Sequence, residues 1–163
     1  MTEPASWELA LYEAEKTCHL RLAKILGLTD GVDAFIGSNG GKVDCAVFDI
    51  GYAMTGEVFG FAADKYHFRG RVDLYSRDRK QIQIWIMRIL KAMPIARQQS
   101  VTDDLTKESN VYCFRTAPET KTVEEITTVE LKKDKQENGV PVWTTAVQFD
   151  IVFGAGKRAP VQA

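Results

Sequence analysis

The clearest pattern of apolar and polar positions lies between residues 66 and 93, where a strand pattern runs directly into a helix pattern. Apolar and polar residues alternate from Tyr66 to Tyr75, as in a strand with one buried face. Ser76 stands where a helix N-cap is expected, and Asp78 in the first turn would face the positive end of the helix dipole. We predict a strand over 66–75 and then an amphipathic helix that Pro94 ends, with these residues on its apolar stripe: Ile82, Trp85, Ile86, Ile89, Leu90 and Met93.

A second amphipathic helix is predicted near the N-terminus. Ser6 is its candidate N-cap, and Gly27 is its C-terminal stop. Between them, apolar residues recur at intervals of three and four, which places them on one stripe: Trp7, Leu11, Ala14, Cys18, Leu22 and Ile25. We expect this stripe to face the protein core.

Short apolar runs and glycine-rich segments predict strands between the two helices. Val32–Ile36 is a candidate short strand, and residues 37–41 form a loop by composition. Cys45–Gly51 and Met54–Phe61 are two further candidate strands, which glycines bend. After the second helix, residues 96–109 are polar and predict a mobile loop.

The C-terminal third is predicted to be β-structure. Val111–Arg115 is a short strand, while Val123–Lys133 and Val142–Phe153 form the arms of a hairpin with Asn138-Gly139 as its turn signal. Each arm has about ten residues, on the order of 33 Å, which is longer than a small core requires. The second arm alternates most cleanly, with these residues on one face: Trp143, Thr145, Val147, Phe149, Ile151 and Phe153.

The order of helix, strands, helix and strands predicts the fold class. It favours an α+β two-layer sandwich, a mainly antiparallel or mixed sheet with both helices on one face and a long C-terminal β-hairpin. We expect residues 1–153 to form a single domain and residues 154–163 a flexible tail. The predicted core combines Trp7, Leu11, Leu22, Ile82, Ile86, Ile89, Phe149 and Ile151.

Length and composition fit one soluble domain. The chain has 163 residues, 45% of them hydrophobic, and a formal net charge of −1, which argues against an obligate nucleic-acid-binding protein. No apolar run approaches the roughly 18 residues of a membrane span, and the first residues lack a signal-peptide pattern. Three widely spaced cysteines, Cys18, Cys45 and Cys113, predict reduced core thiols in a cytoplasmic compartment.

Positive charge is concentrated in residues 65–97, which contain nine basic and two acidic residues, a net charge of +7. Two arginines share the polar face of the predicted strand, and three cations lie on the outer side of the second helix. This candidate basic surface is either an ordinary solvated face or a face for nucleic acid or an acidic partner. Its members are Arg69, Arg71, Lys80, Arg88 and Lys91.

The sequence contains no complete phosphate-binding or metal-binding motif. A phosphate loop ending at Gly41-Lys42 would need glycine at position 36 and serine or threonine at position 43, which are Ile36 and Val43. Cys18 and His19 are adjacent, so on a helix they point about 100° apart and have no ligand at metal-site spacing. We expect Cys18 in the core and His19 in solvent, with no metal and no cofactor.

Catalytic pairings are also unsupported by the pattern. A nucleophile pair would combine Cys45 or Cys113 with His67, but nothing in the sequence brings them together, so core cysteines and an exposed histidine are the simpler interpretation. Adjacent acids in a strand, as at 124–125, point to opposite faces and make a poor acid–base couple. We therefore expect no catalytic residues.

Both predicted helices carry apolar residues away from their buried stripes. Ile84 and Met87 lie roughly opposite the stripe of the second helix, among basic residues, and Leu9 and Leu20 repeat this on the first helix. Scattered exposed apolar residues are ordinary in monomers. Their presence on both helices also fits a contact between subunits, so these four are the candidate subunit-interface residues.

Two segments resemble parts of a viral protein family. The strand-to-helix passage Arg71–Ser76 runs into the apolar helix Ile82–Leu90, and the final strand Val142–Phe153 has the form Trp-x-x-x-Val-x-Phe-x-Ile-x-Phe. Together with the order of elements, they resemble the tail terminator or tail completion (minor tail) proteins of long-tailed bacteriophages. The resemblance covers most of the chain as an order of elements.

The resemblance implies a non-enzymatic phage or prophage virion assembly protein. Members of this family form hexameric rings that cap the tail tube and join it to the head connector, with DNA passing through the lumen. It implies a homo-oligomer whose partners are tail-tube and head-connector proteins, with DNA contact at most weak and non-specific and no membrane. It places the protein in the host cytoplasm during assembly and then in the virion tail, without secretion.

Two other interpretations remain open. Another phage neck or minor tail protein would share every feature described so far. A small nucleic-acid-binding regulatory module would use the basic segment 65–97, although it lacks a recognisable recognition motif. A small enzyme is disfavoured because no ligand or nucleophile set is complete.

Overall fold

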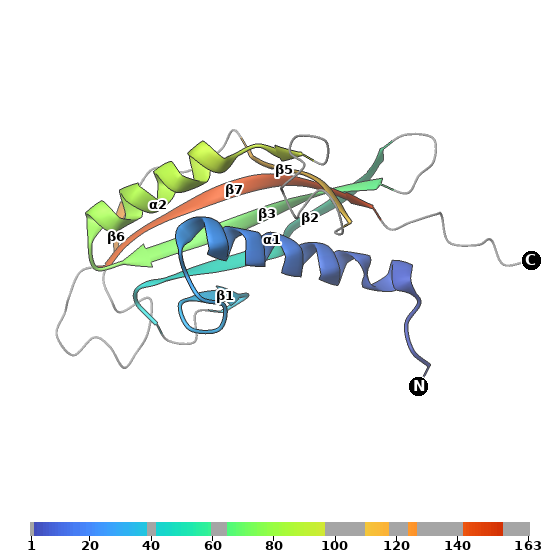
Figure 1. Cartoon of the computed structure of the whole chain (residues 1–163), viewed down its shortest axis with the longest axis horizontal. Coiled ribbons are helices and arrows are strands. Elements are labelled where there is room, and N and C mark those ends of the chain that lie inside the picture. The colour runs from blue at the N-terminus through green and yellow to red at the C-terminus, as the bar shows by residue number, and fades with distance from the viewer. Residues whose placement is uncertain are drawn as a thin grey trace, which may run out of the picture.

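The computed structural model describes residues 2–38, 42–59, 65–96, 110–117, 124–126 and 142–154. The described residues form two α-helices, one short 3-10 helix and seven strands (Figure 1). In chain order they are η1 (Ser6–Leu9), α1 (Ala10–Leu26), β1 (Ala34–Ile36), β2 (Cys45–Phe59), β3 (Lys65–Ser76), α2 (Arg79–Ala92), β4 (Ile95–Ala96), β5 (Val111–Thr116), β6 (Glu124–Ile126) and β7 (Val142–Gly154).

The strands form one mixed sheet in the order β1-β2-β3-β7-β5-β4, with β6 paired to the start of β7. β1 and β2 are parallel, and every other described pair is antiparallel. At the centre, β3 and β7 pair over twelve residues, from Lys65 opposite Gly154 to Ser76 opposite Trp143. The sheet is therefore built around two strands that lie far apart in the sequence.

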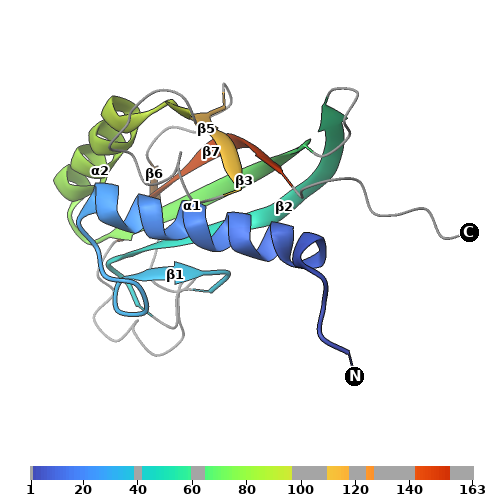
Figure 2. The same ribbon diagram turned by 45° about the vertical axis from the view of Figure 1, so that its right-hand side comes forward.

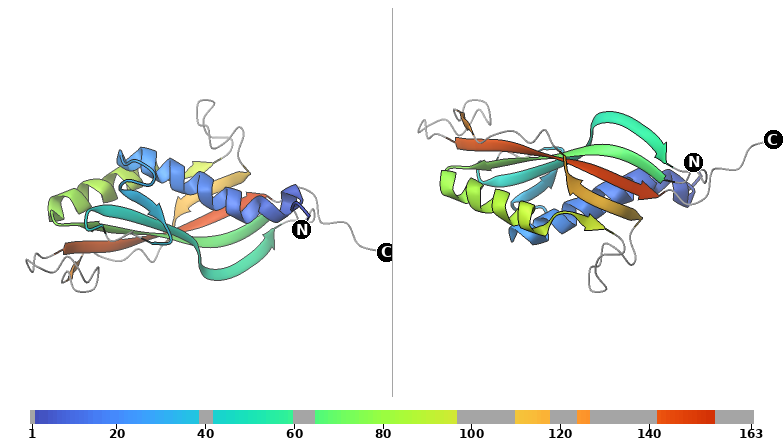
Figure 3. Two further views of the ribbon diagram at one scale, coloured as in Figure 1. Left: turned by 90° about the horizontal axis from the view of Figure 1, so that it is seen from below. Right: turned by 90° about the horizontal axis from the view of Figure 1, so that it is seen from above.

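Both α-helices cover the same face of this sheet, as the oblique view and the views from below and above show (Figures 2 and 3). None of the described helices covers the other face. The guanidinium of Arg79, at the start of α2, lies 5.4 Å from the ring centroid of Trp143 on β7, which holds the helix over the sheet. The predicted α+β two-layer sandwich is confirmed.

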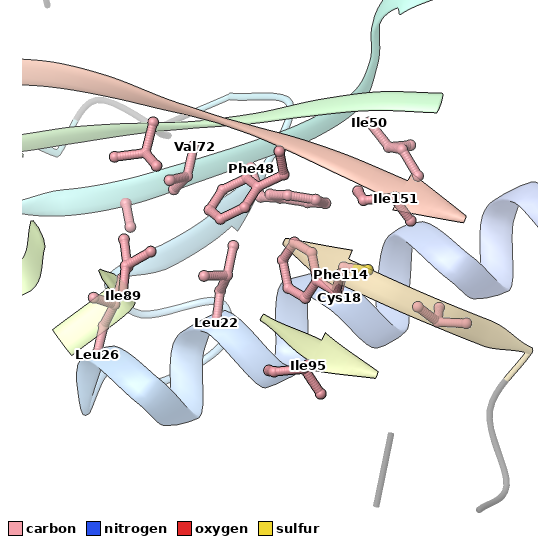
Figure 4. Close-up of a cluster of buried hydrophobic side chains, with 14 of the residues drawn as sticks. Cys18, Leu22, Leu26, Phe48, Ile50, Val72, Ile89, Ile95, Phe114 and Ile151 are labelled. Carbon is pink, nitrogen blue, oxygen red and sulfur yellow. The ribbon is translucent and has the colours of Figure 1, made fainter. Parts of the chain in front are cut away.

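The core lies between the helices and the sheet (Figure 4). α1 contributes a buried stripe that includes Cys18, Leu22 and Leu26, because these residues recur at helical spacing. The sheet contributes an aromatic cluster formed by the rings of Phe48, Phe114 and Phe149. The ring centroids of Phe114 and Phe149 are 4.8 Å apart. Of the predicted core, these residues are buried: Leu22, Ile82, Ile89, Phe149 and Ile151.

Two residues predicted in the apolar stripes are exposed. Trp7 is 43% exposed because it lies in η1, where three residues make a turn, so its side chain is rotated away from the stripe of α1. Leu90 is exposed because it lies about 105° around the helix from the centre of the buried stripe of α2, at 100° per residue. The predicted core position of Trp7 is wrong.

The helix starts also differ from the prediction. α2 begins at Arg79, and its N-cap is Asp78, whose Oδ1 accepts a hydrogen bond from the backbone N–H of Lys80 at 3.0 Å. Ser76 still ends β3, and its hydroxyl accepts from the backbone N–H of Asp78. Ser6 begins the 3-10 helix and does not cap α1. Gly27 is the predicted C-terminal stop, with φ of 75°.

The two strands predicted at 45–51 and 54–61 are one strand, β2, with irregular pairing to β3 between Asp49 and Ala53 and between Ala53 and Glu57. The strand continues through both irregularities, because a bulge absorbs extra residues without ending the pairing. In the predicted hairpin, Glu124–Ile126 pairs with Val142–Thr144. The remainder of the first arm, its Asn-Gly turn, the loop from 97 to 109 and residues 155–163 lie outside the described residues.

Gly70 makes room for the aromatic cluster. A β-carbon at position 70 would lie 2.8 Å from Cδ1 of Ile151 and 3.2 Å from the ring of Phe48. We expect Gly70→Ala to lower the free energy of unfolding by about 1–3 kcal/mol, as overpacking of a core does. Chemical denaturation measures this change.

The Ile151→Val background provides the control, because it removes the Cδ1 atom that position 70 approaches. Gly70→Ala should cost less in that background than in the wild type, and the difference is the coupling energy of a double-mutant cycle. An equal loss in both backgrounds would show that the contact with Ile151 is not the cause.

Candidate functional site

Two of the three cysteines lie in the core as predicted, whereas Cys113 is only partly buried, so its predicted core position is wrong. Cys18 and Cys45 are buried, and burial raises the pKa of the Cys18 thiol far above its usual value and that of Cys45 to about 12. Burial also raises the pKa of Cys113. Thiols with raised pKa values keep their protons near neutral pH and are weak nucleophiles.

The histidines are not paired with cysteines in the way that a nucleophile pair requires. Cys113 on β5 and His67 on β3 both lie opposite Val152, so β7 separates them by two strand spacings, about 10 Å. The prediction that His67 is exposed is wrong: its side chain is only 22% exposed, and its Nε2 lies 3.0 Å from Asp150 Oδ1. The geometry does not bring a Cys–His couple together.

His19 was expected in solvent, and this expectation is wrong. Its side chain is buried, and its Nε2 lies 2.7 Å from Oδ1 of Asp30 in the turn before β1. The contact joins α1 to the segment that precedes β1. Helical spacing within α1 could not predict it, because Asp30 lies outside the helix. In the part of the chain that the structure describes, no three His, Cys, Asp or Glu side chains form a group that could hold a metal ion.

The sheet face opposite the helices carries a cluster of charged side chains centred on Asp150. The Asp150 side chain is only 10% exposed, and its Oδ1 lies 2.9 Å from Nε of Arg69 as well as near His67. Its Oδ2 lies 3.7 Å from Nε of Arg115. Beside this cluster, Nε of Arg71 donates to Oδ1 of Asp73 at 2.6 Å. Carboxylates therefore offset the positive charge of this face.

The structure divides the candidate basic surface into two parts. Arg69 and Arg71 lie on the sheet face opposite the helices, whereas Lys80, Arg88 and Lys91 lie on α2. The division arises because α2 packs on the sheet face that buries Val72 and Leu74, and the two arginines alternate with those residues. The five residues do not form one continuous surface.

Arg88 also has a structural contact. Its Nη1 donates to the carbonyl oxygen of Leu26 at 2.8 Å, at the C-terminal end of α1. A cation is favourable there because the last carbonyls of a helix lack intrahelical partners and carry partial negative charge. Arg88 thus joins the two helices.

A polar cavity of about 390 Å³ lies where the end of α1 meets the start of α2. Its acids make structural contacts: Asp33 accepts from the backbone of Thr29, Asp78 caps α2, and Asp44 pairs with Arg77. Burial alone would raise the pKa of Asp44, but hydrogen bonds from the backbone and side chain of Arg77 lower it below its usual value. The acidic side chains that line this cavity therefore stabilise the local backbone at the end of α1 and the start of α2, and their contacts do not define a reactive group.

The outer face of α2 forms a shallow hollow of about 460 Å³. Its apolar floor includes Met87, which is 59% exposed, and Ile84. Both were predicted to lie away from the core because they fall opposite the buried stripe. We call this site the α2 hollow, and its lining residues are Lys80, Gln83, Ile84, Met87, Arg88 and Lys91.

The outer face of α1 also exposes apolar side chains. Leu9 and Leu20, named from the sequence, are exposed, and so is Tyr12, at 60%. Sequence reasoning did not select Tyr12, although its position three residues after Leu9 places it on the same side of the helix. Trp7 in η1 is also exposed, but its position five residues before Tyr12 does not place it on the same side of the helix.

Comparison with models of known protein families and with curated protein sequences finds no match for this chain. Among the described residues, no helix is both long enough and apolar enough to cross a membrane. The exposed apolar residues on the outer faces of α1 and α2 form the candidate functional sites.

Proposed function

We propose that this chain is a non-enzymatic phage or prophage virion assembly protein, similar to tail terminators, that forms a ring capping the tail tube and joining it to the head connector. The order of elements and the final strand resemble that family. Assembly of this kind needs no activated nucleophile, which fits the raised pKa values of the thiols. The protein would assemble in the host cytoplasm and remain in the virion tail.

The observation that carries the proposal is the exposure of apolar side chains on the outer faces of both helices. Met87 lies in the α2 hollow, while Leu9 and Tyr12 lie at the start of α1. The start of α1 and the helix α2 are at opposite ends of the molecule (Figures 1 and 2). Two different contact surfaces on one subunit produce head-to-tail association, which closes into a ring when the rotation between subunits allows.

Self-association is expected at high protein concentration, as a discrete oligomer near six subunits. The double variant Ile84→Glu, Met87→Glu should remain folded but become monomeric, because it places two carboxylates where an apolar contact is proposed. Light scattering after size-exclusion chromatography measures the mass of each. Isolated tail tubes, added in a parallel experiment, provide the template that a tail protein would use.

The matched control is Val32→Glu, Ile36→Glu, which replaces two other exposed apolar residues outside both helices. It should leave the oligomer intact, so that loss of assembly cannot be assigned to added charge alone. If the wild type stays monomeric at high concentration and does not bind tail tubes, the ring proposal fails.

Binding to duplex DNA is expected to be weak and without sequence preference. Arg69 and Arg71 have carboxylate partners and Arg88 contacts a backbone carbonyl, so few cations are available to neutralise phosphates. Because each phosphate contact contributes a slope of about −0.9 in log–log salt dependence, binding should disappear near physiological salt. Fluorescence anisotropy at two salt concentrations checks this. Sequence-selective binding at about 200 mM salt would favour the regulatory module instead.

A further inference from the structure

The α2 hollow is basic as well as apolar. Lys80, Arg88 and Lys91 surround its floor, and α2 contains no acidic residue. Although Nη1 of Arg88 contacts the end of α1, its charge remains part of the rim. A surface that fills this hollow should be apolar in its centre and acidic around it, because complementary charge steers and orients association.

The first half of α1, with the 3-10 helix before it, has these properties. Glu8 and Glu13 are exposed beside Leu9 and Tyr12, and no basic residue occurs before Lys16. Glu8 is four residues from Tyr12, and Leu9 is four residues from Glu13, so acidic and apolar side chains alternate along one side. We call this surface the α1 N-terminal face, and it comprises Glu8, Leu9, Tyr12 and Glu13.

The two surfaces cannot meet within one chain. The C-terminal end of α1 is fixed beside α2 by the bond between Arg88 and Leu26, so the 17-residue helix carries its first turns about 25 Å away. Figures 1 and 2 show the start of α1 at the end of the molecule opposite α2. Only another copy of the chain can present the α1 N-terminal face to the hollow.

We propose that the α1 N-terminal face of one copy docks into the α2 hollow of the next copy. The inference rests on the self-assembly proposed above and adds which surfaces meet. Tyr12 would be the anchor, since tyrosine is one of the residue types that dominate the energetics of many interfaces. Met87 would adapt to it, because its unbranched side chain fills irregular gaps. The charges of Glu8 and Glu13 would face those of Lys80 and Lys91.

A contact of one helix face per subunit is small, so each contact is weak alone and closure of the ring adds to its stability. Association should therefore rise steeply with concentration. It should also fall as salt is added, because the charged pairs lie at the rim and are screened.

Mixing two damaged variants tests the pairing directly. One variant, Ile84→Glu, Met87→Glu, lacks the hollow but keeps the α1 N-terminal face. The other, Leu9→Lys, Tyr12→Lys, lacks the face but keeps the hollow. Each alone should associate at least roughly tenfold more weakly than the wild type. Their mixture should form a complex containing both in equal number, because one intact face and one intact hollow remain.

Val32→Lys, Ile36→Lys is the matched control, since both residues are exposed and lie outside both proposed surfaces. It should associate like the wild type. Sedimentation velocity gives the masses, and circular dichroism shows whether each variant is folded. If the Leu9→Lys, Tyr12→Lys variant still associates fully, or if mixing yields no complex, the pairing is wrong while the ring proposal stands. A wild type that never associates, with or without tail tubes, overturns both.

Discussion

Replacement of Ile89 by alanine is expected to lower the free energy of unfolding by about 2–5 kcal/mol. Ile89 is fully buried in α2, within the core that both helices and the sheet share (Figure 4). The loss combines the transfer free energy of the removed methyl and methylene groups with the energy of the cavity that remains. Urea denaturation monitored by circular dichroism gives the change.

The neighbouring residue supplies the control. Leu90 is 47% exposed, so Leu90→Ala should cost about 1 kcal/mol or less. Both substitutions remove aliphatic atoms from adjacent positions of one helix, and only their burial differs. A shift of less than about half a kcal/mol for Ile89→Ala would mean that the facing of α2 is incorrect.

Removal of the Asp150 carboxylate is expected to be the second large effect. Three cationic or polar groups, from His67, Arg69 and Arg115, surround this carboxylate on the sheet face opposite the helices. In the Asp150→Ala variant, the side chains of His67, Arg69 and Arg115 would remain close together without a carboxylate between them. Removing one partner of a fully buried ion pair typically lowers the free energy of unfolding by about 3–5 kcal/mol. Here the arginines are partly exposed and can recover some hydration, so we expect Asp150→Ala to lower it by about 2–3 kcal/mol.

An exposed pair provides the comparison. Asp44 and Arg77 are both substantially exposed, so Asp44→Ala should cost about 1 kcal/mol or less despite a good hydrogen-bond geometry. Equal losses for the two aspartates, measured by the same urea denaturation, would show that burial of Asp150 does not govern its contribution. A gain in stability for Asp150→Ala would contradict the proposed role of the carboxylate.

Periodicity predicts most of the architecture because the main elements are long and have one buried face. The alternation from Tyr66 to Tyr75 corresponds to β3, and the stripe that includes Ile82 and Ile89 corresponds to α2. Period alone did not locate Trp7, because the rotation per residue differs between a 3-10 helix and an α-helix. It also could not identify the pairing of β3 with β7, since the alternation of one strand carries no information about its neighbours.

Helical periodicity also predicts part of the candidate site. Ile84 and Met87 were selected because they fall opposite the buried stripe, and both line the α2 hollow. Tyr12 was not selected, although its spacing from Leu9 held the signal. The basic residues were grouped by their nearness in sequence, but the packing of α2 on one sheet face separates Arg69 from Lys80. Such a separation depends on how elements stack, which the pattern within each element does not determine.

The pairing of β3 with β7 has a consequence for the newly made chain. Partners in these strands are separated by 67 to 89 residues, so β3 leaves the ribosome long before β7 exists. At about 5–20 residues per second, one edge of β3 remains unpaired for roughly 3–18 s before its partner strand is synthesised. An unpaired strand edge is a template for association with other chains, and late long-range contacts slow folding. Substitutions in the last strand should therefore affect the yield of soluble protein more strongly than their effect on the finished fold suggests.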